Sequence, residues 1–250
     1  MKDLDPKGSP SDFRRSPGGG ASPARKSGRV LASLNVGRPR PLERRGRAAP
    51  TAIFKSPVED GLLLSETGLE GDEQADLRVH GGPDKAVCAY CAENLPYWSK
   101  VLGTCLAPGA FGENFTVEGM PESDVCIGDV YEVGDAVVQI SQPRQPCFKL
   151  AVRHGLPEMA LLVQESGKTG FYLRCLEPGE VRRGDGIHLL ERAAGAVGVA
   201  ESNRIMHRDK SDMAAAERLL EAPGLSASWR KSLAKRLAGH IENPTARLDG

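Results

Sequence analysis

Cys147 stands among residues that could give its thiol a chemical role. The segment around it, residues 141–150, reads SQPRQPCFKL. Two prolines restrict the backbone before the cysteine, and positive charge on Arg144 and Lys149 would stabilise a thiolate. A thiolate binds a soft or high-valent metal centre, or it attacks an electrophile. Free cysteines are often simply buried, so these neighbours alone leave a structural cysteine as the more common outcome.

Three other stretches combine glycines with polar side chains. They are residues 80–85 (HGGPDK), 108–115 (PGAFGENF) and 169–174 (TGFYLR). Their glycines would let a ligand approach backbone N–H groups. Together with the segment around Cys147, they supply these donors: His80, Lys85, Asn114, Arg144, Lys149 and Arg174. A polar, partly anionic ligand in a concave site fits this set.

Cys88 and Cys91 have the spacing of a redox or metal pair. We expect both in one strand, where positions three apart point to opposite faces, so they would not readily share a disulfide or a metal ion. The sequence contains no second cysteine pair of the kind that zinc sites use. We therefore interpret both as core cysteines.

Short apolar or alternating runs, broken by Gly, Pro and Asp, fill the chain from residue 30 to about residue 190. This pattern is typical of many short strands, and it predicts a mainly β domain with a closed or sandwiched architecture. The main strands expected on this basis are residues 30–36, 51–54, 86–90, 114–117, 135–140 and 186–190.

The last part of the chain changes to Ala, Leu, Arg and Glu with helical spacing. We expect a short helix at residues 199–206. Asp209 or Ser211 would cap a second helix that runs through Leu220, and Ser226 would cap a third. The sequence therefore predicts a small helical region after the strands.

The composition points away from nucleic acid polymers and membranes as partners. Lys and Arg total 33 and Asp and Glu total 33, so no global field would recruit a polyanion. No apolar run approaches the roughly 20 residues of a membrane span, and no secretory pattern opens the chain. The six irregularly spaced cysteines are expected to be reduced thiols. We therefore expect a cytoplasmic protein.

Residues 1–28 are rich in Gly, Ser, Pro and basic side chains and hold few large apolar residues. Such a segment buries too little apolar surface to offset its ordering entropy, so we expect it to be disordered. The patterned sequence begins at Val30, which raises the hypothesis that translation starts near this residue. Mass spectrometry that found Met1 on the native protein would contradict that hypothesis.

Five motifs resemble the successive signatures of the MOSC family, the domain named for the molybdenum cofactor sulfurase C-terminus. Their order and spacing are most similar to the stand-alone YiiM-like type, in which a three-helix domain follows the MOSC domain. On this resemblance, residues 29–192 form the MOSC domain and residues 193–250 the helical domain. The motifs are GLEGDEQAD at residues 68–76, HGGPDKAV at 80–87, GAFGENFT at 109–116, CIGD at 126–129 and SQPRQPCFKL at 141–150.

The resemblance implies a MOSC-type β-barrel that binds the molybdenum cofactor (molybdopterin), with Cys147 as the sulfur ligand to the metal. His80, whose unperturbed pKa lies near neutrality, would donate a proton during catalysis; a turn histidine is the alternative. Asp84 and Glu113 could instead cap loops or orient basic partners. The implied cofactor-binding residues are Gly81, Gly82, Lys85, Gly112, Glu113, Asn114, Ser141, Arg144, Lys149 and Arg174.

Similar family members reduce N-hydroxylated compounds, such as hydroxylaminopurines and hydroxylamines, in detoxification. The sequence contains no dinucleotide fingerprint and no iron–sulfur cysteine array, so we expect a separate flavin reductase to deliver the electrons. The alternative function is a binding protein that carries the cofactor, or that carries sulfur as a persulfide on Cys147. A third possibility is a scaffold whose helical region binds a partner.

Overall fold

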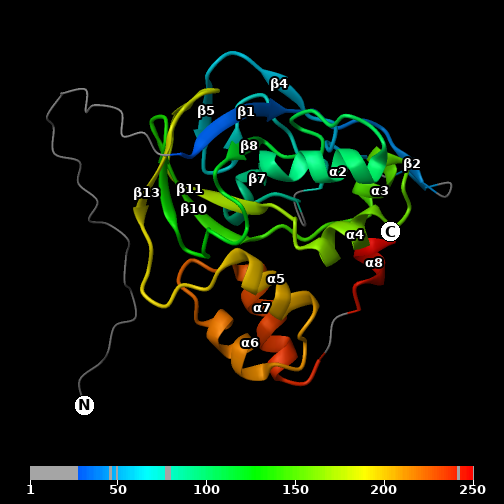
Figure 1. Cartoon of the computed structure of the whole chain (residues 1–250), viewed down its shortest axis with the longest axis vertical. Helices are drawn as coiled ribbons and strands as arrows, with labels where there is room; N and C mark the ends of the chain where they lie inside the picture. The colour runs from blue at the N-terminus through cyan, green and yellow to red at the C-terminus, as the bar shows by residue number, and fades with distance from the viewer. Residues whose placement is uncertain (1–27, 45–46, 49, 77–79, 241–242, 250) are drawn as a thin grey trace, which may run out of the picture.

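The computed structural model describes residues 28–44, 47–48, 50–76, 80–240 and 243–249. The expected disorder of residues 1–28 therefore falls, except for Gly28, outside the described residues. Figure 1 shows a strand-rich body with a group of helices from the last part of the chain packed against it.

The central element is a sheet of eight strands. In chain order they are β1 (Val30–Val36), β4 (Ser56–Val58), β7 (Val87–Cys91), β8 (Phe115–Glu118), β9 (Val130–Val133), β10 (Ala136–Pro143), β11 (Phe171–Glu177) and β13 (Ile187–Glu191). Their spatial order is β13-β9-β10-β11-β7-β8-β1-β4. Neighbours are antiparallel, except that β7 and β8 are parallel.

Two smaller sheets accompany the central one among the described residues. Their strands are β2 (Glu43–Arg44), β3 (Arg47–Ala48), β5 (Leu62–Ser65), β6 (Gly68–Leu69) and β12 (Gly179–Val181). The three-stranded sheet has the order β12-β5-β6, and β2 pairs with β3.

The expected closed barrel is not confirmed. The ladder of the central sheet ends at β13 on one side and at β4 on the other. An isolated bridge joins Val30 to Gly186, and Leu31 exchanges backbone hydrogen bonds with Asp185 and Gly184 at 2.9 and 2.8 Å. These contacts bring β1 and the start of β13 together without forming a continuous ladder. The fold is therefore a mixed, sheet-dominated one with several helices.

All but one of the main expected strands form within a few residues of their expected positions. The exception is residues 51–54, where Thr51 makes only an isolated bridge to Arg40. The carbonyl of Ile53 accepts a hydrogen bond from Nη1 of Arg153 at 2.6 Å. A side chain thus takes a backbone acceptor that a neighbouring strand would otherwise have paired.

Three helices interrupt the strand-rich part of the chain, where the sequence pattern predicted strands only. They are α2 (Leu95–Leu102), α3 (Lys149–His154) and α4 (Met159–Ser166), and two 3-10 turns, η1 (Pro83–Lys85) and η2 (Ala92–Asn94), accompany them. Each of the three helices ends at a glycine in the left-handed region, which satisfies the backbone geometry of a helix C-terminus.

The C-terminal helices are α5 (Val199–His207), α6 (Met213–Leu220), α7 (Ala227–Leu237) and the short α8 (Thr245–Leu248). Ser226 caps α7 as expected, because its Oγ accepts a hydrogen bond from the amide of Trp229 at 3.3 Å. The expected cap of α6 was wrong. Asp212 caps it rather than Asp209 or Ser211, by accepting a hydrogen bond from the amide of Ala215 at 3.0 Å.

Two hydrophobic clusters hold the molecule together. The larger one joins the sheet to the helices, since Tyr131 and Ile140 belong to the same cluster as Leu219 and Trp229. Burying such side chains is worth roughly 1.5–3 kcal/mol each. The second cluster lies where α2, α3 and α4 meet the sheet; its buried members are Ile53, Tyr90, Leu95, Trp98, Ala110, Phe111, Leu150, Ala151, Met159 and Val163.

Candidate functional site

A pocket brings together segments that are far apart in the sequence. Its volume is about 560 Å³ when the part open to solvent is included. The lining residues are Thr51, Ala52, Ile53, Lys55, Glu73, Gln74, Ala75, His80, Lys85, Cys88, Gly112, Asn114, Arg144, Cys147, Lys149 and Tyr172.

Cys147 lies in the loop between β10 and α3, and 9% of its surface is exposed. Its Sγ lies 3.9 Å from Nε2 of His80, which is 67 residues away in the sequence. Lys149, the first residue of α3, lines the same pocket. The amide of Arg144 donates to the carbonyl of Gly170 at 3.0 Å, which fixes the start of the loop against the β11 side. The loop therefore presents one thiol and two cations to a single cavity.

His80 is a neutral imidazole at pH 7. Burial, together with positive charge on Lys149, Arg144 and Lys85, lowers its pKa to about 4, while Asp76 opposes the shift. This differs from the expected value near neutrality. The neutral ring carries one N–H, so it donates a hydrogen bond at one nitrogen and accepts at the other.

Arg144 has a buried guanidinium nitrogen without a hydrogen-bond partner among the described residues. This atom is Nη1, and only 6% of the residue is exposed. Removing a charged group from water without a partner costs free energy. Glu73, the one carboxylate among the described lining residues, lies 3.8 Å from Arg38 at the surface. The pocket therefore favours an anionic group beside Arg144.

Lys55, a lining residue that the sequence did not single out, has a compensated charge. Its side chain forms an ion pair with Asp72, and the two side chains are 6% and 1% exposed. Asp72 also accepts a hydrogen bond from Nδ2 of Asn114 at 2.9 Å. The Asn114 Oδ1 in turn accepts from the amide of Cys88 at 3.2 Å. Asn114 therefore lines the pocket while its amide group is engaged by the wall.

Lys85 lies in η1 and reaches the pocket over an aromatic ring. Its Nζ lies 5.7 Å from the ring centroid of Tyr172. Burial lowers the pKa of Lys85, and the neighbouring Asp84 carboxylate opposes this shift. A cation at this position is held close to the ring face and to any ligand beside it.

The structure places seven of the predicted site residues around the pocket. They are His80, Lys85, Gly112, Asn114, Arg144, Cys147 and Lys149. Five other predicted residues do not line it: Gly81, Gly82, Glu113, Ser141 and Arg174. Contacts within the protein engage four of these five residues, namely Gly82, Glu113, Ser141 and Arg174.

Glu113 shapes the loop before β8. The carboxylate is fully buried, and its two oxygens accept hydrogen bonds from the amides of Gly109 and Phe111 at 2.6 and 2.9 Å. Oε1 also accepts from the hydroxyl of Thr116 at 2.9 Å. Glu113 is thus an internal loop cap, and it supports the pocket through the adjacent Gly112.

Gly82 does not line the pocket but allows a backbone turn. Its φ is 92°, which side-chain-bearing residues rarely adopt. Its carbonyl accepts a hydrogen bond from the amide of Lys85 at 2.9 Å. Gly82 thereby closes the turn that carries Lys85 to the pocket.

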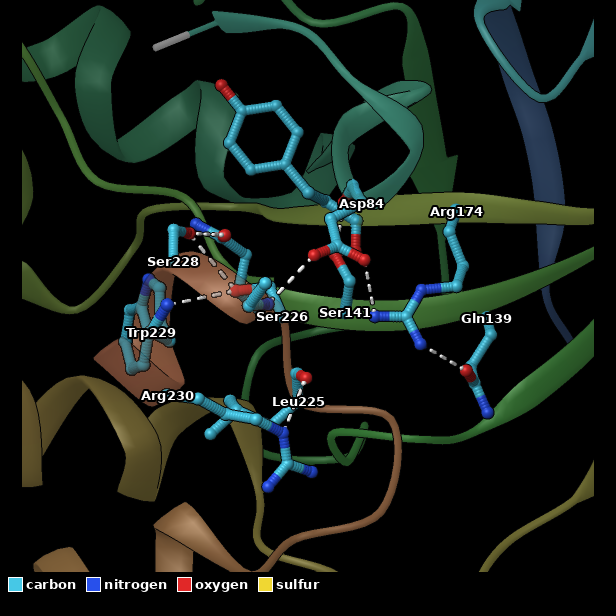
Figure 2. A network of polar contacts seen from close by, with 12 residues as sticks. Asp84, Gln139, Ser141, Arg174, Leu225, Ser226, Ser228, Trp229 and Arg230 are labelled. Atoms are coloured by element: carbon cyan, nitrogen blue, oxygen red, sulfur yellow. Dashed lines mark hydrogen bonds and ion pairs between the residues drawn. The ribbon is translucent and has the colours of Figure 1, made fainter. Parts of the chain in front are cut away.

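Arg174 and Ser141 belong to a network beside the pocket, which Figure 2 shows. Arg174 donates through Nη2 to Asp84 Oδ1 at 2.7 Å and through Nη1 to Gln139 Oε1 at 2.9 Å. Ser141 donates to the Asp84 carbonyl at 2.5 Å. The other Asp84 oxygen accepts from the amide of Ala227, at the start of α7, at 2.8 Å. Arg174 is therefore engaged by side-chain acceptors, and Ser141 by a backbone carbonyl.

Cys88 and Tyr172, like Lys55, line the pocket but were not among the predicted site residues. They are register partners on β7 and β11, and both are largely buried. Burial raises the pKa of Cys88 to about 11, so its thiol stays protonated at neutral pH. Cys88 and Cys91 are both buried as expected, but Cys88 is also part of the pocket. The sequence feature that could have indicated Cys88 as a pocket residue is its position in the strand directly after the glycine-rich turn at residues 80–85.

Comparisons with known proteins identify the family of this chain. Residues 76–188 match the MOSC domain, and residues 197–240 match the YiiM-like, 3-alpha helix domain. The chain is 50% identical to Bacillus subtilis (strain 168) YflK over 82% of this chain and 93% of that protein. It is 41% identical to Escherichia coli (strain K12) YiiM over 80% of this chain and 91% of YiiM. The chain belongs to the MOSC family, in its YiiM-like form.

The crystal structure of YiiM from Geobacillus stearothermophilus has the same fold as this MOSC protein. The TM-score is 0.72 at 40% identity, over 84% of this chain and 99% of that chain. A Gibberella moniliformis (strain M3125 / FGSC 7600) protein named Reductase is 37% identical over 59% of this chain. The matched region is 27% of that protein, so most of it lies outside the similarity.

The described residues of the MOSC protein include no group of three or more His, Cys, Asp or Glu side chains that could hold a metal ion. Within the described part of the chain, no helix is both long and apolar enough to cross a membrane.

Proposed function

We propose that the pocket binds the molybdenum cofactor and that Cys147 is the protein ligand to molybdenum. MOSC domains are associated with this cofactor, which supports the proposal. The chemistry of the donor set fits as well. A pterin-bound metal arrives with ligands of its own and needs one thiolate from the protein. Two cysteines line the pocket; burial raises the pKa of Cys88 to about 11, which leaves Cys147, in the loop with Arg144 and Lys149, as the proposed ligand.

Arg144 is the observation that carries the proposal. Its buried Nη1 lacks a partner among the described residues, and Lys149 and Lys85 line the same pocket. A phosphate-bearing ligand would compensate this charge, because a guanidinium binds phosphate oxygens in a bidentate way. Gly112 contributes shape: a Cβ on this residue would lie 2.7 Å from Cγ1 of Ile53, so only glycine leaves the wall intact.

We further propose that the protein reduces N-hydroxylated compounds, such as hydroxylaminopurines and hydroxylamines. The overall reaction converts an N–OH group to N–H and water, and it consumes two electrons and two protons. The bound cofactor would supply the two-electron chemistry at the N–O bond. Cys147 would anchor the metal, Arg144, Lys149 and Lys85 would orient the cofactor, and the half-buried walls would limit access of water.

His80 would contribute through its neutral ring beside Cys147. In the cofactor-free protein three cations lower its pKa. An anionic cofactor would compensate those cations, which makes protonation of the ring easier than it is without the cofactor. In this proposal His80 holds a proton at one ring nitrogen, close to the side chain that binds the metal.

The proposed electron donor is a separate flavin reductase. The Gibberella moniliformis relative named Reductase supports a reductive function for a region similar to this chain. The MOSC protein would then receive electrons at the pocket from a partner whose own cofactor carries them.

The test begins with protein purified anaerobically from a host that makes the cofactor. Molybdenum and pterin content are measured first, and then turnover of 6-hydroxylaminopurine with reduced methyl viologen as the electron donor. We expect about one molybdenum per chain and amine formation, with both lost in Cys147→Ser and both retained in Cys105→Ser, because Cys105 is exposed and lies outside the pocket. Full activity of Cys147→Ser would overturn the ligand assignment. Loaded protein without reductase activity would favour the cofactor carrier instead.

A further inference from the structure

We propose that Arg247, three residues before the end of the chain, is a positioning residue for Cys147. It lies in α8, beyond the residues 197–240 that match the 3-alpha helix domain. Its Nη1 donates a hydrogen bond to the carbonyl of Pro146. Its own carbonyl accepts a hydrogen bond from the amide of Phe148 at 2.9 Å. One residue therefore holds the backbone on both sides of Cys147.

Arg247 also connects this loop to a helix of the body. Its Nη2 donates to Oε1 of Gln164, on α4, at 2.6 Å. In Figure 1 α8 lies beside α4 and close to α3. Val163, the residue before Gln164, is fully buried in the second hydrophobic cluster. The loop is thus tied to an element whose position is set by packing.

The contacts suit a positioning role because they engage backbone groups on either side of Cys147. Pro146 has no amide hydrogen, so its carbonyl is its only backbone group for hydrogen bonding, and Arg247 engages it. Phe148 is the N-cap residue of α3, a position whose amide has no partner within the helix. A substitution of Arg247 keeps the backbone carbonyl that Phe148 contacts but removes the side-chain donor to Pro146. The Pro146 carbonyl would then turn to water, and the loop would open more often.

The consequence for the metal rests on the proposed function, whereas the positioning of the loop does not. A metal ligand must be held in one geometry, and residues that orient a ligand change metal affinity without touching the metal. Arg247 does not line the pocket, so it acts through the loop that it holds.

The experiment measures alkylation of individual cysteines in cofactor-free, full-length protein by iodoacetamide and mass spectrometry. Cys147 is 9% exposed, Cys88 is 6% exposed, and Cys105 is exposed. We expect Arg247→Ala to accelerate alkylation of Cys147 about tenfold or more, because a charge-assisted hydrogen bond is lost. Cys88 and Cys105 should react as in the wild type. Arg247→Lys, which keeps the charge but not the two-armed geometry, should fall in between.

Arg218→Ala is the matched control. Arg218 lies on α6 and pairs with Glu201 at the surface, away from the pocket lining. This variant should leave Cys147 alkylation unchanged. Equal acceleration at Cys88 and Cys147 in Arg247→Ala would indicate general destabilisation and would overturn the proposal. Unchanged alkylation of Cys147 in a folded Arg247→Ala protein would overturn it as well.

A second measurement separates this inference from the proposed function. In protein from a cofactor-producing host, Arg247→Ala should retain several-fold less molybdenum than the wild type after gel filtration. If the wild type itself holds no molybdenum, the proposed function fails, and the alkylation rates still decide whether Arg247 positions Cys147.

Discussion

The carboxylate of Asp84 accepts a hydrogen bond from the guanidinium of Arg174, with 2.7 Å between Oδ1 and Nη2 (Figure 2). The same carboxylate accepts the amide of Ala227 at the start of α7. The Gly-rich turn that carries Lys85 is therefore joined to the helical region by one acidic side chain. Arg174 was expected to contact the ligand, but its guanidinium instead pairs with Asp84.

Arg174→Ala should weaken this joint without emptying the pocket. The side chains of Arg174 and Asp84 are 22% and 28% exposed, so we expect a loss of about 1 kcal/mol in the free energy of unfolding. Urea denaturation measures this loss. Molybdenum content of protein from a cofactor-producing host should stay near the wild-type level. A fall as large as the one expected for Arg144→Met would show that Arg174 contacts the cofactor.

Arg144→Met should have opposite effects on the empty and the loaded protein. Met keeps a long apolar stem and removes a buried charge whose Nη1 has no described partner. We therefore expect the cofactor-free variant to be more stable by about 1 kcal/mol or more. The same variant should lose most of its molybdenum and pterin, as measured by metal analysis and pterin fluorescence. Lower stability of the cofactor-free variant would mean that Arg144 already has a partner in solution.

Glu113→Gln should destabilise the loop that carries Gly112. The carboxylate accepts from the amides of Gly109 and Phe111, and an amide side chain offers one acceptor oxygen where the carboxylate offers two. An unsatisfied buried amide costs about 1–3 kcal/mol, which thermal and urea unfolding would detect. Glu118→Gln is the control, because Glu118 is exposed at the end of β8. Equal stability of the two variants would refute the role of Glu113 as a loop cap.

His207 should make the protein less stable in mild acid. Burial lowers its pKa to about 3 in the folded state, with Arg247, Lys210 and Arg236 acting in the same direction. The unfolded chain binds the proton below about pH 6.5, whereas the folded chain does not, so stability falls as the pH decreases from about 6.5 towards 3. Within this window one such group contributes about 1.4 kcal/mol per pH unit. Above pH 7 it contributes no pH dependence.

The measurement for His207 is the urea midpoint of unfolding between pH 7.5 and 4.5. His207→Phe keeps an aromatic ring near Trp229, whose ring centroid lies 6.3 Å away, and removes the titrating group. The variant should lose part of the acid sensitivity and retain most of its stability at neutral pH. Identical pH profiles for variant and wild type would contradict the pKa assignment.

Much of the local structure was predictable because it depends on neighbouring residues. The alternation in residues 30–36 predicted β1 with its observed bounds, and Ser226 caps α7 as its type and position indicate. Arg144 and Lys149 could be associated with Cys147 because a few residues of chain keep them close. The helices at Lys149–His154 and Met159–Ser166 were missed because short apolar runs do not distinguish a buried strand from a buried helix.

The sequence alone indicated a strand-rich region followed by helices, the segments that could bind an anionic ligand, and the cysteine with the most suggestive neighbours. Only the tertiary structure decided which of these side chains share a cavity. His80 meets Cys147 across 67 residues, Cys88 and Tyr172 join the pocket from adjacent strands, and Arg247 reaches back from the end of the chain. Arg174 shows the converse. Its charge marks it as a ligand contact in the sequence, but the fold brings Asp84 next to it, and a buried or half-buried cation binds whichever anion packing brings within reach.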